Sequence, residues 1–128
     1  MEIPRNADMP ARHYRDAHLT LDFDRQLATL DSQPLTLTRK EYDLLALLVT
    51  YAGLIVPRSE LLRRVWGYAS GTRTRTLDVH IRHLRKKLGV YADEYIETVF
   101  GIGHRFQPFD TSRRYLTATE RPVLAMGA

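Results

Sequence analysis

The chain has 128 residues, of which 44% are hydrophobic, and its 19 Lys and Arg residues exceed its 15 Asp and Glu residues, giving a net charge of +4. This composition predicts one domain with enough apolar residues for a core, and the basic excess favours an acidic partner such as nucleic acid, anionic lipid or acidic protein. The absence of cysteine excludes disulfides, thiol catalysis and cysteine-based zinc sites, and because no apolar run is long enough for a bilayer span or a secretion signal, we expect a cytoplasmic protein.

Residues 1–17 contain two prolines, mix charges and show no hydrophobic periodicity, so we expect a flexible leader or the remnant of an interdomain linker. Three short runs follow, at residues 18–23, 26–30 and 34–37, with turn residues between them. This spacing predicts an antiparallel meander. A further strand could lie in the leader, although the pattern does not place it.

Residues 38–52 are predicted to form the first helix. Thr38 and Glu41 have the spacing of a capping box, in which each side chain accepts a hydrogen bond from the backbone of the other residue. Apolar residues then recur at helical spacing, and Gly53 is the natural stop. One side of this helix should therefore face the core.

A second helix is predicted over residues 58–66, after a short apolar link at residues 54–56. Pro57 is acceptable at the start of a helix, and Gly67 ends it. A loop of small and polar residues, 68–71, leads to a third helical segment. Three helices joined by short links are typical of a helix-turn-helix arrangement.

Residues 72–88 are predicted to form an amphipathic helix with a basic outer face. Its apolar stripe consists of Leu77, Ile81, Leu84 and Leu88. The segment holds six basic residues against one acid, Asp78, a net charge of +5 in a chain that carries +4 overall. Charge gathered on one helix favours a polyanionic partner, although an arginine-rich surface helix exposed to solvent would have the same composition. Asp78 is expected to pair with a nearby arginine rather than to read a base.

A β-hairpin is predicted behind the basic helix. After a loop at residues 91–94, residues 95–100 are rich in β-branched and aromatic types, residues 101–103 (Gly-Ile-Gly) permit a turn with positive φ, and residues 104–106 start the return strand. We expect the hairpin to carry a basic tip and to form a wing beside the helix. Residues 108–128 form a tail to which the sequence assigns no role.

These elements carry motifs at characteristic spacings: LTLT and EY at the first helix, ELL and VWG in the second, RTLDVHI and LRKKL in the third, and TV, GIG and RF in the hairpin. Each motif is weak alone, but all of them in this order over about residues 18–106 are specific. On these motifs the chain resembles the DNA-binding effector domain of OmpR/PhoB-type response regulators, which are winged-helix transcription factors.

The resemblance implies an α+β fold of the winged helix-turn-helix type, with a four-stranded N-terminal antiparallel sheet, a three-helix core and a C-terminal hairpin wing. The domain is expected at residues 18–107, between the leader 1–17 and the tail 108–128, with the fourth strand near the end of the leader or around the helix links. The third helix of the family, here residues 73–88, lies in the major groove, and the wing, here residues 95–107, reaches into the minor groove.

The resemblance also implies which residues contact DNA. Those expected at bases or the adjacent backbone are Val79, Arg82, His83 and Lys86. Those at positions that commonly touch phosphates are Arg75, Thr76, His80 and Arg85, with Arg73 as a further basic residue at the start of the segment. Trp66 matches a backbone-contacting tryptophan or lies purely in the core, and Arg105 matches the wing residue that enters the minor groove. Arg and Lys neutralise phosphates, an arginine fork binds guanine, and a narrow A·T-rich minor groove attracts arginine.

Three positions depart from the family pattern. His83 stands where many members carry an arginine, Phe100 replaces an arginine just before the wing turn, and His104 replaces a tyrosine. The change at His83 implies a different base preference, and the change at Phe100 removes one positive charge. The residues before the first predicted strand are also too few for the receiver domain that normally precedes this domain. The chain is therefore expected to be an isolated effector domain or a protein without a receiver.

We expect a sequence-specific, double-stranded DNA-binding regulator of transcription that pairs on direct repeats, as its relatives do. Loop 67–74 either meets RNA polymerase or is a plain connector. Two alternatives remain: a non-specific, nucleoid-type DNA binder, favoured slightly by the arginines missing at His83 and Phe100, and a winged helix used for protein contact, which would lack the basic face. No nucleophile–base or carboxylate pair indicates an enzyme, and His80 and His83 lack a third metal ligand, so we expect no catalysis, metal or cofactor.

Overall fold

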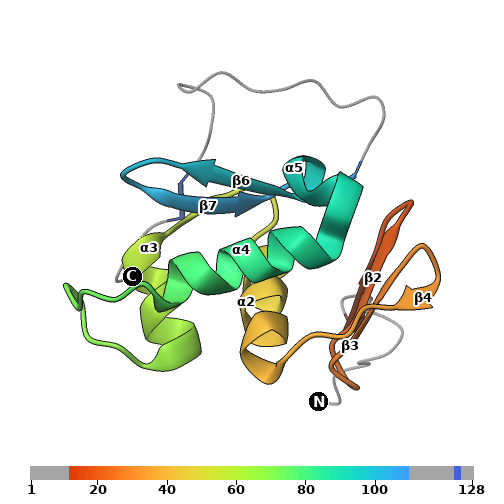
Figure 1. The fold of residues 1–128 in the computed structure, drawn as a ribbon, viewed down its shortest axis with the longest axis horizontal. Helices are drawn as coiled ribbons and strands as arrows, with labels where there is room; N and C mark the ends of the chain where they lie inside the picture. The colour runs from red at the N-terminus through yellow and green to blue at the C-terminus, as the bar shows by residue number, and fades with distance from the viewer. Residues whose placement is uncertain (1–11, 110–122, 125–128) are drawn as a thin grey trace, which may run out of the picture.

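The computed structural model describes residues 12–109 and 123–124. Two antiparallel sheets accompany the helices: a four-stranded sheet in the order β1-β2-β3-β4 and a three-stranded sheet in the order β5-β7-β6. Figure 1 shows helices α2 and α4 in the centre, with the β6–β7 hairpin along one side and the N-terminal sheet at one end. This arrangement confirms the predicted α+β winged helix-turn-helix fold.

The N-terminal sheet consists of four short strands, β1 (His13–Arg15), β2 (Leu19–Asp22), β3 (Leu27–Leu30) and β4 (Gln33–Pro34). Each strand pairs antiparallel with the next, as a meander does. The predicted meander is therefore confirmed, and the fourth strand is β1, near the end of the predicted leader.

Asp16 connects the segment before residue 18 to distant parts of the fold. Its carboxylate accepts hydrogen bonds from the backbone N–H of Leu19 (2.9 Å), the hydroxyl of Tyr95 (2.7 Å) and the backbone N–H of Phe109 (3.0 Å), and also from the hydroxyl of Tyr14. Burial acts to raise the pKa of Asp16, but the hydrogen bonds from the Leu19 N–H and from the Tyr14 and Tyr95 hydroxyls hold it below its ordinary value. Residues 13–15 of the predicted leader thus form a strand of the N-terminal sheet, which Asp16 connects to the rest of the fold.

Helix α2 (Arg39–Thr50) has the predicted capping box. Thr38 Oγ1 accepts from the N–H of Glu41, and the Glu41 carboxylate accepts from the N–H of Thr38. These bonds satisfy two of the backbone donors that a helix start leaves without partners. The apolar side of α2 is buried in the core, as its periodicity predicts.

The predicted link at residues 54–56 is a strand instead. β5 (Ile55–Pro57) pairs antiparallel with β7 and becomes an edge of the second sheet. A three-residue strand has no local sequence signal, because its partner lies far along the chain. The second helix follows as α3 (Arg58–Leu61), which continues into the π-helical turn η2 (Leu62–Trp66) and ends at Gly67 with φ of 76°.

Helix α4 (Thr76–Leu88) buries the predicted stripe of Leu77, Ile81, Leu84 and Leu88. It begins at Thr76, later than the predicted start at residues 72–73, because Thr74 is held outside the helix: its Oγ1 accepts from the N–H of Thr76, and its carbonyl accepts from Arg58. The predicted loop at residues 91–94 is also helical, with a 3₁₀ turn η3 (Gly89–Tyr91) and a short helix α5 (Ala92–Tyr95).

The hairpin consists of β6 (Ile96–Val99) and β7 (Gly103–Phe106), joined by a turn in which Gly101 has φ of 78°. Gly103 has a different role: a Cβ there would lie 2.0 Å from the carbonyl oxygen of Val56, so only glycine lets β5 and β7 approach this closely. Val123 of the predicted tail forms an isolated parallel bridge with Ile55. Residues 1–11, 110–122 and 125–128 lie outside the described part of the chain.

Candidate nucleic-acid interface

The outer face of α4 and the segment just before it carry exposed cations. Within residues 12–109, four of them form neither a hydrogen bond nor an ion pair with another described residue; they are Arg73, Arg75, Arg82 and Lys86. Val79 and His80 lie half-buried beside them. Cations that are exposed and uncompensated in this way can neutralise phosphates and release their counterions.

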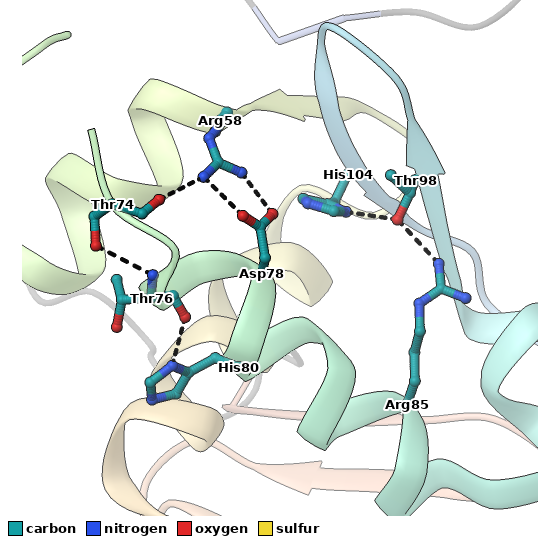
Figure 2. A network of polar contacts seen from close by, with 8 residues as sticks. All are labelled: Arg58, Thr74, Thr76, Asp78, His80, Arg85, Thr98 and His104. Atoms are coloured by element: carbon teal, nitrogen blue, oxygen red, sulfur yellow. Dashed lines mark hydrogen bonds and ion pairs between the residues drawn. The ribbon is translucent and has the colours of Figure 1, made fainter. Parts of the chain in front are cut away.

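Arg58 fixes the start of α4 (Figure 2). Its Nη1 and Nη2 atoms bind the two carboxylate oxygens of Asp78 at 2.7 and 3.0 Å, and Nη2 also donates to the carbonyl of Thr74 at 2.8 Å. The hydrogen bonds from Arg58 lower the pKa of Asp78, so this carboxylate stays charged. Asp78 therefore has the intramolecular arginine partner that was predicted. The negative charge of the one acid in α4 is balanced by the positive charge of Arg58. The sequence pattern assigned no role to Arg58.

The rings of Trp66 and His80 pack against each other beside the first turns of α4. The two rings lie edge to face with centroids 4.9 Å apart, and Nδ1 of His80 lies 2.7 Å from the carbonyl oxygen of Thr76. Trp66 is half-buried and packs against the hydrophobic core. This geometry is compatible with both predicted roles of Trp66, the core residue and the backbone contact. Part of the ring contacts the core, and part stays accessible.

A buried carboxylate lies behind the C-terminal half of α4. Glu41 is 3% exposed, and its Oε1 accepts from Nζ of Lys87 at 2.6 Å, while Oε2 lies 3.5 Å from Nδ1 of His83. Burial acts to raise the pKa of Glu41, but the hydrogen bonds from Lys87 and from the Thr38 N–H hold it below its ordinary value. Lys87 is thereby turned inward, and one nitrogen of His83 faces the protein.

Arg85 joins α4 to the hairpin and does not point outward (Figure 2). Its Nη2 donates to the carbonyl of Ile96 at 2.8 Å and to Oγ1 of Thr98 at 3.1 Å, and its Nη1 lies 3.3 Å from Asp93. The guanidinium is engaged within the protein, and the phosphate contact of Arg85 stays a prediction. The side chain positions the hairpin against the helix.

His104 extends the same network. It is buried, its Nδ1 lies 3.0 Å from Oγ1 of Thr98, and the Thr98 hydroxyl accepts from Arg85, which leaves its own proton for a neutral imidazole. Burial, together with the positive charge of Arg85, lowers the pKa of His104 to about 4. The hairpin and α4 are thus held together by a neutral histidine, a hydroxyl and a guanidinium.

Arg105 is engaged within the protein in this structure. Its side chain is buried in the central strand β7 and binds the Glu97 carboxylate on β6, with Nε and Nη2 at 2.9 and 2.8 Å from Oε1. The strand register places Arg105 opposite Glu97, and its entry into the minor groove stays a prediction. The predicted basic tip is wrong: the turn is formed by Phe100, Gly101 and Ile102, and Phe100 is 92% exposed.

The described residues hold no group of three or more His, Cys, Asp or Glu side chains placed to bind a metal ion. None of the helices among them is both long enough and apolar enough to cross a membrane.

The family model described as "Transcriptional regulatory protein, C terminal" matches residues 32–106. The response regulator ArlR of Staphylococcus saprophyticus is 44% identical over 87 residues, which is 67% of this chain and 40% of that protein. ArlR of Staphylococcus haemolyticus is 42% identical over the same length and coverage. The chain thus spans 40% of the length of these curated relatives.

Solved structures agree with the family match. The DNA-binding domain of Klebsiella pneumoniae RstA, in complex with the RstA box, superposes with a TM-score of 0.70 at 33% identity and covers 77% of this chain and 99% of that one. The DNA-binding domain of CpxR from E. coli gives a TM-score of 0.68 at 32% identity and covers 75% of this chain and 96% of that one. Both are similar to this chain across the described fold.

Proposed function

We propose that this chain, which belongs to the family of C-terminal domains of transcriptional regulatory proteins, binds specific sequences of double-stranded DNA with α4 in the major groove. The observation that carries the proposal is the exposed face of α4, where basic side chains remain uncompensated while the one acid is neutralised by Arg58. An α-helix fits the major groove, in which each base pair presents a distinct set of donors and acceptors.

The exposed residues of α4 divide by chemistry. Arg82 and Lys86 can bind base acceptors or the adjacent phosphates, and the Val79 methyl groups can meet a thymine methyl. His83 presents the part of its ring that does not face Glu41. Arg73, Arg75 and Thr76, at the start of α4, suit phosphate contacts, and the accessible part of the Trp66–His80 pair suits the sugar-phosphate backbone.

We further propose that two copies bind direct repeats as a tandem pair and that loop 67–74 is available to RNA polymerase. The support for the loop is its exposure, since Gly67, Ala69, Ser70 and Gly71 are all accessible to solvent. The relatives named response regulators are longer than this chain, so we propose that the chain acts as the effector part of such a protein, in the cytoplasm, and that it performs no catalysis.

Selection of bound duplexes from a random pool at about 150 mM salt tests the proposal. Enrichment of one short motif, repeated about one helical turn apart, would support a specific regulator that binds in tandem. Binding without enrichment and with a steep salt dependence would point to the non-specific, nucleoid-type alternative. Absence of binding would point to a protein-interaction module.

A matched pair of variants separates α4 from the rest of the surface. Arg82→Ala removes an exposed cation from α4, whereas Arg25→Ala removes one from the turn between β2 and β3, where the side chain is 79% exposed. The proposal requires the first change to weaken binding to the selected motif and the second to leave it unchanged.

A further inference from the structure

Val123 and Leu124 of the C-terminal tail lie against the domain. Val123 forms a parallel bridge with Ile55 of β5, and the N–H of Leu124 donates to the carbonyl of Ile55 at 2.8 Å. The Leu124 side chain packs against the hydrophobic core, whereas Val123 is 47% exposed. The two residues are therefore held by a backbone hydrogen bond and an apolar contact, although they lie beyond the part of the chain that matches the family, residues 32–106.

The strand that the tail contacts, β5, is an edge of the second sheet. β7 lies along one side of β5, and among the described residues the pairing on its other side is the bridge to Val123. An uncovered edge strand leaves backbone groups without partners. With the tail in place Ile55 is 2% exposed, and a buried carbonyl without a hydrogen bond is costly. The tail thus satisfies the outer edge of β5 in the manner of an added strand.

β5 leads directly into the residue that fixes the start of α4. The strand has three residues and ends at Pro57, and Arg58 follows as the first residue of α3. The backbone N–H of Arg58 donates to the carbonyl of Ile102 at 3.0 Å, and its guanidinium binds Asp78 and the carbonyl of Thr74. These side-chain contacts form the Arg58 clamp. A shift of β5 would therefore displace the clamp and, with it, the start of α4.

We propose that Val123 and Leu124 of the C-terminal tail act as an added strand that holds β5 in place and, through β5, keeps the Arg58 clamp closed on the start of α4. A contact held by so few groups opens more readily than the core does. Displacement of the tail would therefore loosen α4 from a distance, without any contact to α4 itself. The link from tail to clamp stands on the contacts within the domain, whereas its effect on DNA rests on the proposed function.

Amide hydrogen exchange, followed by NMR on the full chain, tests the docking without DNA. The Leu124 amide should be protected in the wild type, because it donates to Ile55. Leu124→Pro removes this donor, and the Arg58 amide should then exchange about three- to tenfold faster, the factor expected for one backbone hydrogen bond. Val123→Ala is the matched control, because it shortens an exposed side chain and keeps the backbone donor of Leu124. An unprotected Leu124 amide, or unchanged exchange at Arg58 in Leu124→Pro, would overturn the proposal.

A double-mutant cycle on the selected DNA motif then tests the route from the tail to α4. Leu124→Pro should weaken binding about threefold, and the double variant with Arg58→Lys should bind about as well as Arg58→Lys alone, because both changes open the same clamp. Losses that multiply in the double variant would overturn the route through Arg58. A wild-type chain that selects no motif would overturn the proposed function, and the exchange rates would still decide whether the tail holds β5.

Discussion

Arg105 and Glu97 face each other across the hairpin and form an ion pair, with Nε and Nη2 of Arg105 at 2.9 and 2.8 Å from the same carboxylate oxygen. The arginine side chain is 4% exposed and the glutamate side chain 20%. A charge that the sequence motif associates with DNA thus holds two strands together. The wing consequently projects Phe100 in place of a cation.

Replacing Arg105 should therefore reduce stability and leave the electrostatics of DNA binding unaltered. Arg105→Met removes the largely buried ion pair with Glu97, which costs roughly 2–4 kcal/mol. Urea unfolding would measure the loss. The salt slope of DNA binding, measured below the unfolding transition, should match that of the wild type, and a slope lowered by about one would show that Arg105 contacts phosphate after all.

Arg82→Ala should weaken DNA binding and leave stability nearly unchanged, which is the opposite of the result expected for Arg105→Met. Arg82 is exposed on α4 and makes no hydrogen bond or ion pair within the described part of the chain. Its loss should weaken binding by roughly 1–3 kcal/mol if it reads a base, and should change the free energy of unfolding by less than about 0.5 kcal/mol. A gel-shift titration and a urea melt on the same preparation would measure both. Unchanged affinity would contradict the placement of α4 in the major groove.

Arg58→Lys should loosen the start of α4 without changing the charge. A lysine ammonium cannot reproduce the planar fork that binds both oxygens of Asp78 and the carbonyl of Thr74. Because the pair is partly exposed, the stability loss should be small, about 1 kcal/mol. We expect specific binding to weaken about threefold to tenfold, because Arg73 and Arg75 are no longer held in place. Arg63→Lys, which alters the ion pair between Arg63 of η2 and Glu60 of α3, is the charge-matched control.

Acid should destabilise the domain through His104. Burial and the nearby Arg85 lower its folded pKa to about 4, against an ordinary value of 6.5 in the unfolded chain. Between these two pH values the unfolded chain binds a proton that the folded chain does not. The stability present above pH 6.5 is therefore lost progressively as the pH falls toward 4, by roughly 2–3 kcal/mol in total.

A comparison of wild type with His104→Gln isolates this contribution from that of the carboxylates. The glutamine amide keeps a polar partner for Thr98 but does not titrate. Urea unfolding at several pH values from 7.5 to 4 should show a shallower loss of stability in the variant. Parallel curves for the two proteins would show that His104 does not stay neutral in the folded state.

Local sequence signals account for most of the fold. The capping box of Thr38 and Glu41, the apolar stripe of α4 and the positive-φ turn at Gly101 depend on residues within a few positions of one another, so periodicity and turn chemistry suffice to place them. The motif order then identified the family. The same local signals did not reveal β5 or the start of α4 at Thr76, because both depend on partners elsewhere in the chain.

In the candidate site, too, some features follow from the local sequence and others from the tertiary structure. The sequence determined which side of α4 is polar, and thereby that Arg82 and Lys86 are exposed. Only the tertiary structure decided that Arg85 and Arg105 turn inward, because the direction of a long cationic side chain depends on whether a carboxylate or carbonyl from another element lies within its reach. A charge count treats all arginines alike, whereas packing distinguishes those that hold the fold together from those left free for a partner.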